Sequence, residues 1–528
     1  MGATPQPLLL TRLSMFRAGV PRRARFWLLV VFALFYQLCG GVYLAALSQM
    51  VGSLSFLSED VSMAGYCSLI GLNMIFPVLF RWKFRLYTRQ MFFVSAGGSI
   101  VCAVAAMYTS VPWVLWLVCF AAGYFKMMGM FGCMSTIQLN ITPSRNFGVF
   151  FSVVYLLVCG AMQVSGLMTA YITYSYDWRM VYCVIVCLML FVEAVTYFLM
   201  KPDHRPGPYI PLKGIDWVGF VLWSSVCCVG AWLFTFGEHY DWWNSRQIWQ
   251  ATWLELGLLA LTLVHQWRKT EPYISLCAFR YPATWTLMFM LMGIAVLEAS
   301  AHVLQPVYLN GVAGYDYYTI VGFNYPEIFG VIMGSILSYF ALVRLRWTLR
   351  VYFCMTFALV TYYVVVMYFL IGPNTEAYMY HPAMFALGAG EIMMEAGATY
   401  VLSQMIPFPH FFMNISIIGF VRCGMGSAAA SAVVERLFAW TGAKYAAVSV
   451  SSDWRGFMPD GWLQGQHLML ALKECYGYLA LVGVALTTLA LAWRYRTVLR
   501  RFVPRVVAVA RWVRSPHRTP DPMLSGSK

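Results

Sequence analysis

The chain has 528 residues, of which 61% are apolar and only 11% are charged. Its mean hydropathy is +0.67, and a soluble protein, in which about a quarter of the residues are charged, cannot bury that much apolar surface. The formal net charge of +15 lies in short clusters between apolar runs rather than on one face, which excludes a nucleic-acid partner. We therefore expect an all-α membrane protein whose surroundings are the lipid bilayer.

The chain starts with a basic segment, residues 1–26, which we predict to be a cytoplasmic tail. The apolar run that begins at Trp27 is too long for the apolar region of a cleavable signal peptide. It is expected to remain as the first membrane span and to direct the chain to the bacterial inner membrane as a multi-pass protein.

A window of about nineteen residues predicts fourteen membrane spans along the chain. They fall at 27–47, 61–80, 91–109, 112–135, 147–173, 179–200, 215–236, 250–268, 284–309, 319–343, 348–372, 379–403, 413–438 and 472–496. Alternate connections, such as 81–89 and 344–350, carry Lys and Arg, whereas the intervening ones carry Asp and Glu. Because Lys and Arg remain on the cytoplasmic side, both termini are predicted to lie inside.

The spans group into two similar sets with a pair between them. Residues 27–200 are predicted to form one six-helix bundle and residues 284–496 a second, with an outward loop at about 439–470. Residues 201–283 are predicted to be a linker with two inserted helices, and residues 497–528 a basic cytoplasmic tail. Basic loops with similar sequences, at 80–85 and 343–347, occupy corresponding places in the two sets.

Short motifs in and after the inserted pair suggest a family. The chain has Ile-Asp-Trp-Val-Gly-Phe at 215–220, Asp-Trp-Trp at 241–243, Pro-Tyr-Ile-Ser-Leu-Cys-Ala-Phe at 272–279 and Arg-Cys-Gly-Met-Gly at 422–426. It resembles the fourteen-helix drug:proton antiporters of the EmrB/QacA type, a branch of the major facilitator superfamily. The resemblance implies the major facilitator fold, with two six-helix bundles, two inserted helices and a substrate site between the halves.

The same resemblance implies a function. Members of this branch are secondary active transporters that export lipophilic small molecules, such as drugs and toxic amphiphiles, by proton antiport with alternating access. The proton gradient is then the energy source, and no cofactor is expected. A periplasmic adaptor protein and an outer-membrane channel are the partners that the resemblance implies.

The sequence departs from the family pattern at three places. The loop after span two keeps its basic residues but lacks the family's Asp and both Gly. Cys39 stands nearest to an Asp that is usual in span one, and 165–170 keeps the small residues of the antiporter motif without its Pro. These differences indicate a divergent member.

Five ionisable side chains lie deep in predicted spans. Glu298 and His302 share one face of span nine, Glu391 and Glu395 share one face of span twelve, and Lys126 is in span four. By resemblance, these spans line the central cavity. Because desolvation disfavours a charged carboxylate, we predict that the two pairs couple protons and that Lys126 adds cavity charge or contacts substrate.

Further residues have predicted supporting roles. Arg422 matches the family pattern in span thirteen and is a second candidate for cavity charge or substrate contact. Gly166, Ala170, Gly419 and Gly426 are predicted to serve close helix packing and gating, because small residues let membrane helices approach each other.

A structural alternative applies to the charged residues. Lys126 could form a buried ion pair with Glu391 or Glu395 that only fixes helix packing. Glu327 lies near the end of its span and is expected to be solvated.

Two other functions compete with export. The first is a facilitator that imports a solute or moves lipid on the same fold. The second, a membrane-embedded enzyme using Glu298 and His302 or the Glu391 and Glu395 pair, is disfavoured because the 8 His show no metal-site spacing. No Gly-rich phosphate loop points to an ATP-driven pump.

Overall fold

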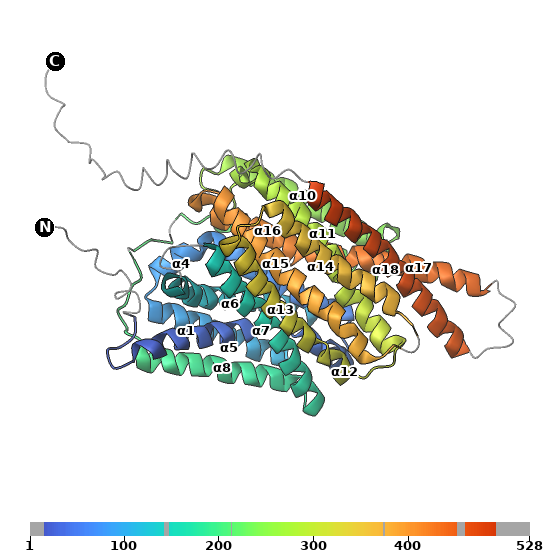
Figure 1. The fold of residues 1–528 in the computed structure, drawn as a ribbon. Helices are drawn as coiled ribbons and strands as arrows, with labels where there is room; N and C mark the ends of the chain where they lie inside the picture. Colours follow the sequence, from blue (N-terminus) through green and yellow to red (C-terminus); the bar gives the residue numbers. More distant parts are fainter. Residues whose placement is uncertain are drawn as a thin grey trace, which may run out of the picture.

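The computed structural model describes residues 15–141, 147–207, 209–212, 214–372, 375–450 and 460–492, and these are almost entirely helical. Hydrocarbon offers no hydrogen-bond partner, so a backbone in a membrane must satisfy its own polar groups, and a helix does so within one segment. Figure 1 shows the helices lying roughly side by side along one direction.

The first half of the molecule comprises eight helices. They are α1 (Arg22–Leu38), α2 (Leu47–Leu54), α3 (Ser58–Met74), α4 (Leu79–Arg85), α5 (Thr88–Tyr108), α6 (Pro112–Ile141), α7 (Phe147–Ser175) and α8 (Arg179–Leu199). The inserted pair is α9 (Trp217–Thr235) and α10 (Arg246–Arg268).

The second half also comprises eight helices. They are α11 (Pro282–Gly311), α12 (Tyr317–Gly322), α13 (Asn324–Tyr339), α14 (Leu349–Leu370), α15 (His381–Met405), α16 (Phe408–Arg422), α17 (Met425–Val450) and α18 (Asp460–Ala492). Short 3₁₀ or π turns connect or extend these helices at η1 (Leu44–Ala46), η2 (Phe76–Val78), η3 (Trp242–Asn244), η4 (Leu276–Arg280), η5 (Phe340–Arg344) and η6 (Ala377–Tyr380).

Within the described ranges, eleven helices are long and apolar enough to cross a membrane. Each of the fourteen predicted spans overlaps a helix, but α1, α10 and α15 are not among the eleven. α1 has only 17 residues, whereas a bilayer core needs about 20. α10 and α15 contain ionisable residues, among them Glu255 and Glu391. The chain is therefore a multi-pass membrane protein, and the predicted count of fourteen exceeds the eleven that these properties identify.

The first predicted span is interrupted rather than continuous. α1 ends at Leu38, and the chain runs in an extended form to η1. The hydroxyl of Tyr43 accepts a hydrogen bond from the Gly40 amide at 2.9 Å and donates one to the Leu38 carbonyl at 3.1 Å. One side chain thus satisfies backbone groups that the break exposes, as a membrane requires.

The thirteenth predicted span is also interrupted, and there a glycine is required. Cys423 is extended and Gly424 has a φ of +82°, a conformation that costs other residues about 1–2 kcal/mol. α16 therefore ends at Arg422, and α17 starts afresh at Met425.

The two halves meet along two seams. α7 packs against α13 and α15, and α3 packs against α16 and α17, while α9 of the inserted pair packs against both α3 and α17. In the second seam, the Asn73 amide donates to the Gly419 carbonyl at 3.2 Å, and the Ser416 hydroxyl donates to the Asn73 carbonyl at 2.9 Å. Polar side chains therefore join the halves deep between the helices.

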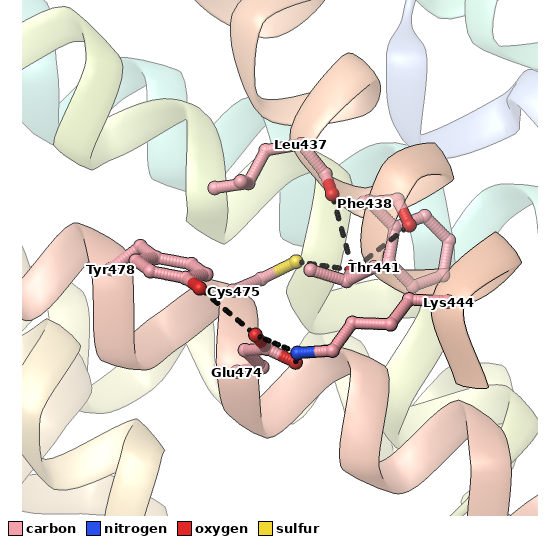
Figure 2. A network of polar contacts seen from close by, with 7 residues as sticks. All are labelled: Leu437, Phe438, Thr441, Lys444, Glu474, Cys475 and Tyr478. Carbon is pink, nitrogen blue, oxygen red and sulfur yellow. Dashed lines mark hydrogen bonds and ion pairs between the residues drawn. The ribbon is translucent and has the colours of Figure 1, made fainter. Parts of the chain in front are cut away.

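The predicted outward loop at about 439–470 is largely helical. α17 continues to Val450 and α18 begins at Asp460, and their ends project beyond the other helices at the right of Figure 1. Lys444 donates to both carboxylate oxygens of Glu474, at 2.7 and 3.0 Å, and the Tyr478 hydroxyl donates to Glu474 at 2.9 Å (Figure 2). These contacts hold the projecting ends together.

The predicted tails are described only in part. Of residues 1–26, those from Met15 onward are described, and they are tied to the end of α8. The Arg17 amide donates to the Leu199 carbonyl and the Lys201 amide donates to the Met15 carbonyl, both at 2.8 Å. The predicted tail at 497–528 lies outside the described residues.

Candidate functional site

One face of α15 carries a row of polar or small residues. Gly388, Glu391, Glu395 and Thr399 follow each other at helical spacing and so share a face. This helix packs against α7 of the first half. Glu391 and Glu395, predicted from their spacing to act together, therefore lie at the boundary between the halves.

Arg422 provides the positive charge of this site. Its guanidinium Nε forms an ion pair with Glu395 Oε1, and the two side chains are 27% and 9% exposed. Arg422 is the last residue of α16, and its side chain reaches Glu395 of α15. The guanidinium also stacks on the ring of Tyr155 in α7, 5.6 Å from its centroid.

Tyr155 connects this pair to the first half of the molecule. Its hydroxyl shares a hydrogen bond of 2.6 Å with the Thr399 hydroxyl. The guanidinium of Arg422 is thus in contact with α15 and α7 at once, and a change in the separation of these helices alters its surroundings.

Three further carboxylates, those of Glu298, Glu327 and Glu391, lie close enough to this ion pair to interact with it or with one another. Glu298 of α11 interacts electrostatically with Glu391, Glu395, Arg422 and Glu327. We call these five residues the acidic seam. It contains four carboxylates and one guanidinium, so that full ionisation would leave several like charges uncompensated, which low-dielectric surroundings disfavour.

Glu327 lies near a helix end, as predicted, in the first turn of α13. It is half-buried and hydrogen-bonded rather than simply solvated. Its carboxylate Oε1 accepts a hydrogen bond of 2.6 Å from the Gln163 side-chain amide of α7. Glu327 is therefore part of the contact between the halves.

The other predicted charged residues lie apart from the ion pair. His302 lies one turn beyond Glu298 in α11 and is exposed. The Lys126 ammonium in α6 donates to the main-chain carbonyl of Gln37 at 2.9 Å, close to the end of α1. The alternative in which Lys126 pairs with a glutamate is wrong for Glu395, whose partner is Arg422.

The small residues predicted for packing lie at helix contacts. A Cβ on Gly166 would stand 2.8 Å from the Asn324 side-chain amide, and one on Gly419 would stand 2.0 Å from Asn73 Oδ1. A Cβ on Gly426 would meet the Val421 carbonyl across the break before α17. Ala170 is buried.

The motif at the start of the inserted pair has a local structural role. Asp216 caps α9 by accepting from the Gly219 amide at 3.1 Å, and it also contacts His265 Nε2 of α10 at 2.9 Å. A Cβ on Gly219 would lie 2.3 Å from the Asp216 carboxylate. Asp216 therefore joins α9 to α10, which accounts for an Asp and a Gly at this spacing.

Sequence reasoning missed several members of the site. Gln163, Tyr155 and Thr399 are polar groups in apolar spans, and such groups mark interior contacts. That polarity was the available signal, but a single sequence does not indicate which helix faces which.

Comparison with known proteins identifies the fold. A structure of proton-dependent oligopeptide transporters is 14% identical, with a TM-score of 0.60 over 90% of this chain and 99% of that chain. A peptide transporter POT in complex with sulfate is 12% identical, with a TM-score of 0.57 over 88% and 94%. The nucleoside transporter NupG, as a mutant, is 11% identical, with a TM-score of 0.53 over 87% and 98%. No curated protein matches the sequence.

These comparisons define an integral membrane protein with a transporter fold and not an enzyme. The sequence profile of the Major Facilitator Superfamily matches residues 29–431, which is more than half of the chain. The chain therefore belongs to the major facilitator superfamily, as the sequence predicted. The solved structures described above are peptide and nucleoside transporters rather than drug antiporters of the EmrB/QacA type.

Proposed function

We propose that this protein is a proton-coupled secondary transporter that moves a polar organic solute, with the acidic seam as the proton-carrying site. The observation that carries the proposal is the ion pair of Glu395 and Arg422 among three further carboxylates, at the contact between the halves. In a major facilitator this is where alternating access changes the surroundings of a group. A carboxylate there can load a proton in one state and release it in the other.

The chemistry of the site favours a polar solute over a lipophilic one. Arg422 offers a cationic donor and the carboxylates offer acceptors, which suits a solute with charged or hydrogen-bonding groups. Lys126, predicted to contact substrate, would add a second cationic donor. The solved structures of similar fold are described as transporters of peptides and of nucleosides. Solute uptake, the alternative reading of the sequence, is therefore our main proposal.

Export of lipophilic molecules remains the second candidate. It is supported by the inserted pair, whose Asp216 and Gly219 make the contacts that account for the EmrB/QacA-like motif. This second proposal includes a periplasmic adaptor and an outer-membrane channel as partners. It also includes fourteen spans, both termini inside and a bacterial inner membrane, and these three features are equally compatible with solute uptake.

The sign of the driving pH gradient separates the two proposals whatever the orientation of the protein. Purified protein in liposomes, with the membrane potential clamped at zero, is tested against labelled peptides, nucleosides, amino acids and tetraphenylphosphonium. Proton-driven uptake predicts that a polar solute accumulates when the outside is acidic. Accumulation of tetraphenylphosphonium alone, and only when the inside is acidic, would support antiport and contradict solute uptake.

A further inference from the structure

Glu327 is placed between the two halves by close helix packing. A Cβ on Gly388 of α15 would lie 2.9 Å from Glu327 Cγ and 2.4 Å from its carbonyl oxygen, so only glycine leaves room there. This brings Glu327 over the same face of α15 that carries Glu391, three residues beyond Gly388. The α13 helix is thus fixed to α15, and the Glu327 carboxylate is directed toward α7.

The hydrogen bond from Gln163 links this carboxylate to the opposite half. The Gln163 side-chain nitrogen lies 2.6 Å from Glu327 Oε1, well within hydrogen-bonding distance. Beside it, Gly166 lies against the Asn324 side chain, and near the end of α7 the ring of Tyr174 lies 5.6 Å from the ring of Tyr318 in α12. The Gln163–Glu327 bond therefore gives a titratable group to the contact between α7 and the start of the second half's α12 and α13.

Other titratable groups face Glu327 from each neighbouring helix. Glu391 of α15 and Glu298 of α11 interact with it electrostatically, and so does Tyr363 of α14. From α7 it meets the neutral amide of Gln163. Two like charges oppose the ionised form of Glu327, and the amide donor favours it.

We propose that Glu327 is a further proton-carrying residue of the transporter, and that its protonation weakens the contact between α7 and α13. This proposal rests on the proposed function, because it assigns a specific role in proton loading and a conformational consequence to one carboxylate of the acidic seam. An ionised Glu327 accepts a charge-assisted hydrogen bond, whereas the protonated acid accepts a neutral one of about half the strength. Proton loading at Glu327 thereby loosens the two halves at this point.

Hydrogen exchange of the native protein in detergent or nanodiscs tests the proposal without a substrate. Exchange of peptides from α7 and α13 is measured at pH 5.5 and pH 8.5 and corrected for the intrinsic effect of pH. For the wild type we expect about fivefold faster corrected exchange at the lower pH, the size expected when one charge-assisted bond becomes neutral. Glu327→Gln retains an amide that can bond Gln163 but cannot titrate, and it should remove this pH dependence.

A second variant and a control complete the test. Gln163→Leu removes the donor and should give fast exchange at both pH values. Glu193→Gln changes a glutamate of α8 outside the seam and should leave the wild-type pH dependence intact. A Glu327→Gln protein that keeps the wild-type pH dependence would overturn the proposal, as would a wild type without any. Either result is separate from a failure of proton-driven transport, which would count against the proposed function instead.

Discussion

At the residue scale, the site depends on which charges are paired. The sequence indicated that Glu391 and Glu395 share a face and that Arg422 is a charged residue of span thirteen. It did not indicate that Arg422 is the partner of Glu395, because spacing within one helix says nothing about the helix opposite. The same limit hid the hydrogen bond between Gln163 and Glu327, whose residues are 164 positions apart. The structure adds these pairings, and it adds Gln163 to the residues that the sequence had selected.

The pairing predicts a large effect of removing one partner. Arg422→Leu leaves the Glu395 carboxylate without its partner and should lower the free energy of unfolding by about 3–5 kcal/mol. The double variant Arg422→Leu, Glu395→Leu removes both charges and should recover most of that loss. Thermal or denaturant unfolding of the purified proteins measures both.

A surface ion pair provides the control. Arg436 Nη1 lies 3.3 Å from Glu238 Oε1, and its side chain is 56% exposed. Arg436→Leu should cost less than about 1 kcal/mol, because exposed pairs contribute little. Equal losses for Arg422→Leu and Arg436→Leu would mean that the Arg422 pair is not a buried one.

At the scale of the elements, hydropathy located the helices but not their interruptions. A hydropathy window averages over the break between Leu38 and η1 and over the break at Gly424, because both lie within apolar runs. The breaks depend instead on single residues: the Tyr43 hydroxyl satisfies the first, and the left-handed conformation of Gly424 makes the second. The second break ends α16 at Arg422 and thereby positions the only guanidinium of the acidic seam.

Replacing Gly424 tests this dependence. Gly424→Ala places a Cβ in a left-handed conformation and 2.6 Å from Ile70 Cγ1 of α3. We expect a loss of at least about 1–2 kcal/mol in the free energy of unfolding. Gly442→Ala, in a helical part of α17 with no atom within 4 Å of the added Cβ, should be neutral or stabilising by up to about 1 kcal/mol. Similar losses in both variants would show that the break does not require glycine.

At the scale of the whole molecule, the superfamily was predictable and the transport direction was not. Alternating apolar and basic segments indicated the membrane spans, and the resemblance of the inserted-pair motifs implied the major facilitator fold. The family comparison confirms the superfamily. In our proposal, the substrate depends on side chains that come together from separate helices, such as Arg422 and Glu298. Their arrangement follows from tertiary packing, which no local pattern encodes.

The central claim is that the acidic seam couples protons to solute movement. The most direct measurement compares two transport assays on the double variant Glu391→Gln, Glu395→Gln in liposomes. The solute is the one identified with the labelled peptides, nucleosides and amino acids of the liposome test. Exchange of labelled for unlabelled solute needs no net proton movement and should persist, whereas accumulation driven by a pH gradient should be lost. Glu193→Gln should retain both activities. Undiminished proton-driven accumulation by the double variant would contradict the account.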